Sequence, residues 1–265
     1  MNVIALGDTP HGRPAAALFD FDGTLSTLRT GWEGVMAPVM LEALMQAPAS
    51  SGLDLEEHTA RYIHENTGIR TIIQMEWLAV EVRRLGGEPL TPLEYKRIYL
   101  DRLMTVVRGR LAAIAAGEAA PDDFLIAGAR DFITALASMN VVLYVASGTD
   151  EPDVRREVEA LGLHGFFSGG VFGARDAERS FDKDTVIRQI LRETGASGAG
   201  LVVFGDGPVE IRCGREAGAR TIGVASLETT RGGWDMDKVR RLRSAGAHAL
   251  IGDFLEPRPL LEMLS

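Results

Sequence analysis

The stretch that decides the fold is residues 18–26, which read LFDFDGTLS and place Asp20 and Asp22 two residues apart. An apolar run that starts at Ala15 leads into it, and such a short run is typical of a buried strand. Side chains alternate along an extended chain, so the two carboxylates point the same way. Gly23 then permits a sharp turn. The stretch therefore predicts a buried strand that ends in two acids facing a common space.

Composition sets the class of protein. A chain of 265 residues with 46% hydrophobic content buries a substantial core. The net charge of -9, from 37 acidic and 28 basic residues, argues against a broad nucleic-acid surface. Cys213 is the single cysteine, so an intrachain disulfide is impossible. The start, MNVIALGDTPHGRP, lacks a basic, apolar leader, and no run approaches the ~20 apolar residues of a membrane span. We expect a cytoplasmic protein.

Short apolar segments alternate with helical patterns through most of the chain. This alternation predicts an α/β fold with a Rossmann-like parallel sheet and helices on both of its faces. The expected strands are residues 15–21, 141–146, 201–205, 220–225 and 247–251. The expected helices are residues 124–139, 152–161, 184–194, 208–217, 236–245 and 257–264.

The region between residues 29 and 121 lacks strand signals and indicates an inserted, all-helical domain. Its expected helices are residues 31–47, 55–66, 69–85 and 92–116, and the breaks PASSG and GGEPLTP separate them. We therefore expect a catalytic core of residues 1–28 and 122–265, with a helical cap domain of residues 29–121.

Two further expected strands end in polar residues. One runs into Ser147-Gly148-Thr149, and another into Asp206, with Glu210 four residues later. In open α/β sheets, ligands bind outside the carboxyl ends of the strands, so these side chains are expected to meet Asp20 and Asp22 in one crevice. Clustered carboxylates are costly without a cation. Oxygen ligands of this kind suit Mg²⁺.

In this order, the residues resemble the motifs of the haloacid dehalogenase-like hydrolases. The closest likeness is to the phosphatase branch with a helical cap between the first and second motifs, as in phosphoglycolate phosphatase and β-phosphoglucomutase. Residues 20–24, DFDGT, match the first motif and Ser147 with Gly148 the second. Lys183 in SFDKDTVI matches the third, and Gly205-Asp206, more loosely with Glu210, the fourth.

The resemblance implies a role for each matched residue. Asp20 would be the nucleophile, and Asp22 the general acid and base. The phosphoryl group would be bound by Gly23, Ser147, Gly148 and Lys183. Mg²⁺ would be ligated by Asp20, the carbonyl of Asp22 and Asp206, with Glu210 holding a water in the second shell; many relatives have Asp at that position.

The expected activity is hydrolysis of a small phosphorylated metabolite, such as a sugar phosphate or a phosphoglycolate-like acid, through an aspartyl-phosphate. The cap would set the substrate, with Arg70 at an expected helix start as the best single candidate. We expect no nucleic acid and no membrane as a partner, and the sequence does not indicate an oligomeric state.

Alternatives remain open at this point. A phosphosugar mutase of the β-phosphoglucomutase type has the same motifs, and a regulatory module could use Asp20 only as a phosphoacceptor. Dehalogenation is disfavoured, because that reaction would need neither an acid at Asp22 nor a metal site. A Rossmann dehydrogenase is disfavoured, because Gly205-Asp206-Gly207 does not continue into GxGxxG, and no Walker-type GK[ST] occurs.

Overall fold

The computed structural model describes residues 3–7, 12–67, 69–175 and 183–264. The chain divides into two compact units. Unit 1 consists of Met1–Thr30 and Leu111–Ser265, and unit 2 of Gly31–Arg110. Unit 1 is therefore built from two separate stretches of the sequence, with unit 2 inserted between them.

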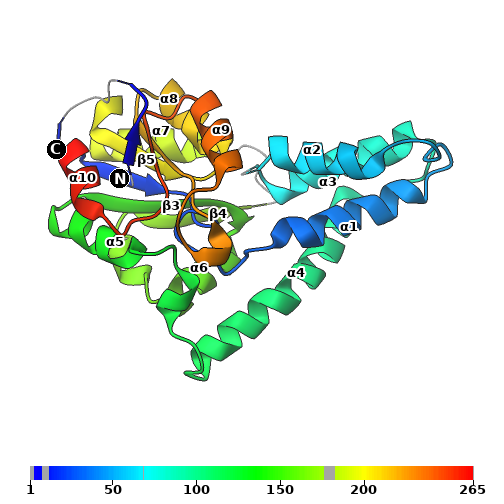
Figure 1. Cartoon of the computed structure of the whole chain (residues 1–265), viewed down its shortest axis with the longest axis horizontal. Helices are drawn as coiled ribbons and strands as arrows, with labels where there is room; N and C mark the ends of the chain where they lie inside the picture. The colour runs from blue at the N-terminus through cyan, green and yellow to red at the C-terminus, as the bar shows by residue number, and fades with distance from the viewer. Residues whose placement is uncertain (1–2, 8–11, 68, 176–182, 265) are drawn as a thin grey trace. The chain divides into compact units, whose positions relative to one another are not determined.

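Unit 1 contains a sheet of seven strands in the order β1-β7-β6-β5-β2-β3-β4 (Figure 1). Strand β1 pairs antiparallel with β7, and the other neighbours pair in parallel. This arrangement confirms the predicted α/β fold with a largely parallel sheet. The strands are β1 (Val3–Ala5), β2 (Ala16–Phe19), β3 (Val142–Asp150), β4 (Gly170–Ala174), β5 (Leu201–Gly205), β6 (Arg220–Val224) and β7 (Ala249–Ile251).

The sequence missed β1 and β4, the two edge strands. Strand β1 has three residues, and β4 is the glycine-rich segment GVFGA, so neither shows the apolar run of a central strand. The helix predicted at residues 124–139 was also wrong in its first part. A 3₁₀ turn occupies Pro121–Phe124, and the helix α5 (Ala129–Ser138) begins only after Gly128, whose φ is 78°.

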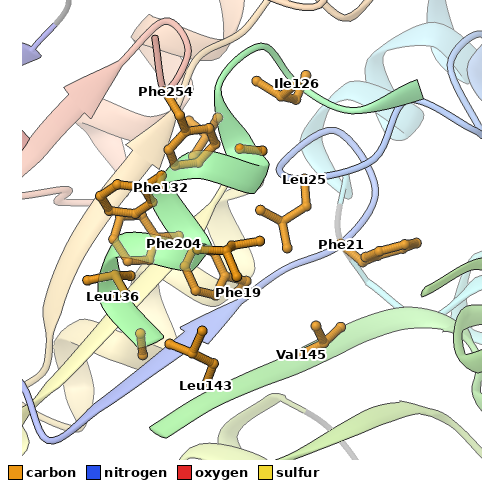
Figure 2. Packing of buried hydrophobic residues seen from close by; sticks show 14 of the residues in the cluster. Phe19, Phe21, Leu25, Ile126, Phe132, Leu136, Leu143, Val145, Phe204 and Phe254 are labelled. Carbon is orange, nitrogen blue, oxygen red and sulfur yellow. The ribbon is translucent and has the colours of Figure 1, made fainter. Parts of the chain in front are cut away.

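Strand β2 contributes to both faces of the sheet because its side chains alternate. Ala17 and Phe19 belong to the larger core, and Ala16 and Leu18 to the opposite face. Figure 2 shows the aromatic centre of the larger core, where the Phe19 and Phe204 rings stack 4.6 Å apart. The burial of β2 on both faces fixes the position at which the chain leaves the sheet.

Helices cover both faces of the sheet (Figure 1). The larger core includes residues of α5, α6 (Glu151–Ala160) and α10 (Pro257–Met263). The opposite face is packed by α7 (Lys183–Thr194), α8 (Pro208–Glu216) and α9 (Met236–Ser244). Apart from the late start of α5, the bounds of these helices differ from the predicted ones by no more than one residue.

The described residues of unit 2, 31–67 and 69–110, form helices joined by turns and loops, and none of these residues lies in a strand. Helix α1 packs on α2 and α3, and the Tyr62 and Trp77 rings stack between α2 and α3 with their centroids 3.7 Å apart. The helices are α1 (Trp32–Met45), α2 (Leu55–Glu65), α3 (Thr71–Arg84) and the first part of α4 (Pro92–Ala115). Within the described parts of the whole chain, no helix combines the length and apolarity of a membrane span.

Candidate active site

Strand β2 lies at the point where the strand order of the sheet reverses. Its neighbours are β3 on one side and β5 on the other, and Phe19 is level with Val145 and Phe204. Parallel strands end at the same edge, so the residues that follow Phe19, Val145 and Phe204 emerge together. Asp20, Ser147 and Asp206 are the polar residues at that edge.

The Asp20 carboxylate is held by a buried lysine. Lys183 Nζ, in the first turn of α7, donates to Asp20 Oδ1 at 2.7 Å and to Glu210 Oε2 at 2.8 Å. Burial raises the pKa of Asp20 well above its usual value; Lys183 opposes this shift, and Glu210 and Asp206 add to it. Burial alone would lower the pKa of Lys183, but Asp20 and Glu210 together raise it. The ammonium therefore stays charged between two carboxylates.

Asp206 is held by a second buried lysine. Lys238 Nζ lies 2.8 Å from Asp206 Oδ2 and 2.8 Å from Glu228 Oε1. The Arg241 guanidinium donates to the Asp206 carbonyl at 3.2 Å and lies 3.8 Å from Oδ2. Burial opposes ionisation of Asp206, but Lys238 and Arg241 outweigh it and lower the pKa. Asp206 is therefore the ionised anchor of this part of the site.

Hydroxyl groups hold Asp22. Ser147 Oγ donates to Asp22 Oδ2 at 3.2 Å, and Thr149 Oγ1 donates to the same oxygen at 2.9 Å. Both hydroxyls come from the end of β3, where the register with β4 shifts between Ala146 and Asp150. Such an irregularity re-aims side chains at a strand end. Asp22 and Asp20 therefore face different kinds of partner.

A buried ion pair lies beside Asp22. The Arg29 guanidinium donates to Glu157, with Nη2 to Oε1 at 2.6 Å and Nε to Oε2 at 3.2 Å. Arg29 Nε also lies 3.8 Å from Asp22 Oδ1. Burial raises the pKa of Glu157 to about 7, Arg29 opposes the shift, and Asp22 adds to it. Although the sequence grouped Arg29 with the helical insertion, the residue belongs to unit 1.

Gly23 provides space for Asp206 and Glu228, the two carboxylates that Lys238 bridges. Its φ is 74°, and a Cβ at this position would lie 2.5 Å from Asp206 Oδ2 and 2.9 Å from Glu228 Oε1. Its amide donates to the carbonyl of Ser26 at 2.9 Å. In this structure Gly23 therefore forms the turn and leaves room for the acids, while its N–H is already engaged.

The acids fit a divalent cation. One carboxylate oxygen from each of Asp20, Asp206 and Glu210 lies within 4.8 Å of the others, and all three residues are buried. The surrounding formal charges leave an excess of two negative charges. That excess comes from the six carboxylates of Asp20, Asp22, Glu157, Asp206, Glu210 and Glu228 against the four cations Arg29, Lys183, Lys238 and Arg241. An oxygen-only, negatively charged cluster of this kind suits Mg²⁺.

Not every predicted site residue lies in this cluster. Gly148 follows Ser147 in β3, within the same strand end. Arg70 belongs to unit 2, where it is the residue that precedes α3. Arg70 and the acidic cluster therefore belong to different units of the chain.

Sequence reasoning missed several members of the charged network. Lys238 carried a signal, because a lysine in the first turn of a helix opposes the helix dipole and needs an acidic partner. Thr149 stood next to the quoted Ser147-Gly148 pair. Glu157, Glu228 and Arg241 gave no comparable signal, because each is one of many charged residues on helices or in loops.

A family model matches more than half of the chain. The family model described as haloacid dehalogenase-like hydrolase matches residues 14–218. None of the curated proteins searched matches the chain.

Solved structures share the fold at low identity. A predicted phosphatase from Clostridium acetobutylicum is 18% identical, with a TM-score of 0.64, and the match covers 95% of this chain and 100% of that one. A predicted phosphoglycolate phosphatase from Haemophilus somnus is 15% identical, with a TM-score of 0.62 and coverages of 94% and 99%. A β-phosphoglucomutase from Clostridium difficile is 14% identical, with a TM-score of 0.58 and coverages of 95% and 97%.

Proposed function

The chain belongs to the haloacid dehalogenase-like hydrolases, and we propose that within this family it is a Mg²⁺-dependent phosphomonoesterase. Its substrate would be a small phosphorylated metabolite, and the reaction would pass through an aspartyl-phosphate. The observation that carries the proposal is the contrast between Asp20, bound to the Lys183 ammonium, and Asp22, bound to two hydroxyls. Two carboxylates in different environments can take two different roles in one reaction.

Asp20 is the proposed nucleophile. One of its oxygens forms a bond to phosphorus while the bond from phosphorus to the ester oxygen breaks. Lys183 holds Asp20 in place and offsets negative charge that gathers on the phosphoryl oxygens. The resulting aspartyl-phosphate divides one difficult displacement into two easier ones.

Asp22 is the proposed proton carrier. It gives a proton to the ester oxygen as the alcohol leaves, and it takes a proton from the water that attacks phosphorus in the second step. That attack releases inorganic phosphate and restores Asp20. The hydroxyls of Ser147 and Thr149 fix the orientation of the Asp22 carboxylate. Proton transfer by a well-placed group contributes about 10²–10⁴-fold.

The residues present fit Mg²⁺, as the oxygen donor set and the excess negative charge indicate. Asp20, Asp206 and the carbonyl of Asp22 would hold the ion, with Glu210 acting through a water. When bound, Mg²⁺ would neutralise part of the charge on the phosphoryl group. Ser147 and the Gly148 amide are proposed to bind the same phosphoryl oxygens.

Unit 2 is the proposed source of substrate selection, as the helical cap. Arg70 is the proposed contact to the part of the substrate that is not phosphate. Arg70→Ala is expected to raise KM for the true substrate more than KM for a small aryl phosphate. Equal changes in the two KM values would assign Arg70 to the fold of unit 2 instead.

The function is tested with an aryl phosphate and with a panel of phosphorylated metabolites, each with and without Mg²⁺. We expect Mg²⁺-dependent release of one inorganic phosphate per dephosphorylated product, without a bisphosphate activator. Conversion to an isomeric phosphate with little free phosphate would favour the mutase. Stable phosphorylation without turnover would favour a regulatory module.

A further inference from the structure

The chain uses lysine sparingly and places it inside. Three of its 28 basic residues are lysines, namely Lys96, Lys183 and Lys238, and all three are buried. Burial of an ammonium is costly unless carboxylates compensate for it. Lys183 is the lysine of the third family motif. Lys96 lies in unit 2. Lys238 lies in unit 1, outside every motif that the sequence analysis identified.

Lys238 repeats the arrangement of Lys183. Each ammonium bridges two carboxylates: Lys183 joins Asp20 to Glu210, and Lys238 joins Asp206 to Glu228. The Lys238 side chain is 7% exposed, as is that of Lys183. The two bridges together hold both acids that follow the central strands β2 and β5.

Other contacts fix Lys238 and its partner. The side chain of Asp235 accepts from the Lys238 amide at 3.1 Å and so caps the first turn of α9. Glu228 Oε2 accepts from Thr30 Oγ1 at 3.0 Å. The helix dipole disfavours a cation at this end of a helix, so the position is sustained by Asp206 and Glu228. This costly placement beside the cluster indicates a role at the site.

We propose that Lys238 is a built-in counter-cation for Asp206 that lowers the affinity of the site for a divalent ion. This inference rests on the proposed function, because Asp206 is there a ligand of Mg²⁺. The ammonium fixes Asp206 Oδ2 at 2.8 Å and satisfies the buried carboxylate when no metal is bound. Its positive charge repels an incoming cation, and Glu228 offsets part of that repulsion.

The test is calorimetric titration of the purified full-length chain with Mg²⁺ alone, together with thermal unfolding in the presence of a chelator. Lys238→Met removes the counter-cation, so Mg²⁺ is expected to bind about tenfold more tightly. The metal-free variant is expected to unfold at a lower temperature, because two buried carboxylates lose their shared partner. Glu228→Gln removes the carboxylate that offsets part of the Lys238 charge. The uncompensated ammonium repels the cation more strongly, so this variant is expected to bind Mg²⁺ more weakly.

Opposite signs in the two variants distinguish this role from a purely structural one, which would weaken Mg²⁺ binding in both. The double variant Lys238→Met/Glu228→Gln replaces the ion pair with neutral side chains of similar size. It is expected to fold and to bind Mg²⁺ more tightly than Glu228→Gln, so the test remains decisive if Lys238→Met alone does not fold.

Equal Mg²⁺ affinities in the double variant and in Glu228→Gln, with wild-type binding intact, would overturn the role of Lys238 alone. Absence of Mg²⁺ binding by the wild-type chain would overturn the metal site of the proposed function, and this inference with it.

Discussion

The two acids that follow β2 occupy contrasting surroundings. Asp20 accepts from an ammonium, and its side chain is 7% exposed. Asp22 accepts from two hydroxyls, lies near the Arg29 guanidinium, and has a side chain that is 23% exposed. One motif of three residues therefore delivers one carboxylate to a charged, dry cluster and the other to a more accessible position, where two hydroxyls are its hydrogen-bond donors.

The difference between the two environments supports the two chemical roles that we propose for this motif. A nucleophile benefits from a fixed position beside cations that stabilise the phosphoryl charge. A proton carrier must be reached by the leaving group and by water, so partial exposure and hydroxyl partners suit it. The side of β2 that faces β5 and α7 provides the first environment, and the end of β3 provides the second.

The largest expected effect is the loss of turnover when the Asp20 carboxylate is replaced. Asp20→Asn is expected to lower kcat by about 10⁴-fold or more, because no second nucleophile replaces it. The fold should persist, since burial beside Glu210 and Asp206 already raises the pKa of Asp20 and disfavours its charge. Phosphate release measures kcat, and urea unfolding provides the control. Near-normal turnover at saturating Mg²⁺ would assign the nucleophile elsewhere.

The next largest effect is the loss of stability when the Arg29–Glu157 ion pair beside Asp22 is broken. Arg29→Met leaves Glu157 buried without its partner, which is expected to cost about 3–5 kcal/mol of unfolding free energy at pH 8. The matched control is Arg29→Met/Glu157→Gln, which removes the unpaired charge and should recover most of the loss. Urea midpoints of the three proteins check this. If the single and double variants unfolded at the same midpoint, the ion pair would have no such role.

The stability of the folded state is also expected to depend on pH through Glu157, which belongs to the same ion pair. Burial raises the pKa of Glu157 from 4.5 to about 7. The folded state then binds a proton that the unfolded state has lost, so this contribution to stability is complete below pH 4.5 and is lost as pH rises through about 7. The loss is expected to be on the order of 3 kcal/mol. Urea midpoints between pH 4.5 and 8 should decline less steeply for Glu157→Gln than for the wild type. Parallel declines would show that Glu157 does not titrate in this range.

The smallest effect concerns the hydroxyls that hold Asp22. Thr149→Val keeps the shape of the side chain and removes the donor at 2.9 Å. A hydrogen bond to a charged group is worth about 1.5–3 kcal/mol, of which Ser147 retains a part, so kcat is expected to fall about tenfold. KM for an aryl phosphate should change little, because Thr149 orients Asp22 and does not bind the phosphoryl group. A change confined to KM would place Thr149 in substrate binding.

Much of the fold followed from local signals in the sequence. The central strands are apolar runs buried on both faces, and runs of this kind are visible without tertiary information. The ends of those strands brought Asp20, Asp206 and Glu210 together, as the parallel sheet required. The edge strands β1 and β4 were missed because they are short or rich in glycine.

The remaining part of the site depends on long-range pairing. Arg29 and Glu157 are 128 residues apart, and nothing near either residue identifies its partner. Lys238 lies in helix α9, whereas Asp206 lies in the turn that follows β5. Their pairing depends on how α9 packs beside the end of β5. Local patterns show which residue types are present, whereas the choice among many acids on helices is made by packing.

The central claim, that Asp20 forms a covalent bond to the phosphoryl group, is tested most directly by mass spectrometry of acid-quenched protein. The Asp22→Asn variant is mixed with Mg²⁺ and an aryl phosphate, whose good leaving group needs little help from an acid. Phosphorylation is then faster than hydrolysis, and the proposed mechanism predicts a phosphoryl group on Asp20. Asp20→Asn/Asp22→Asn should carry none. A phosphoryl group on another residue, or product formation by Asp22→Asn without a detectable phosphorylated protein, would contradict the proposed mechanism.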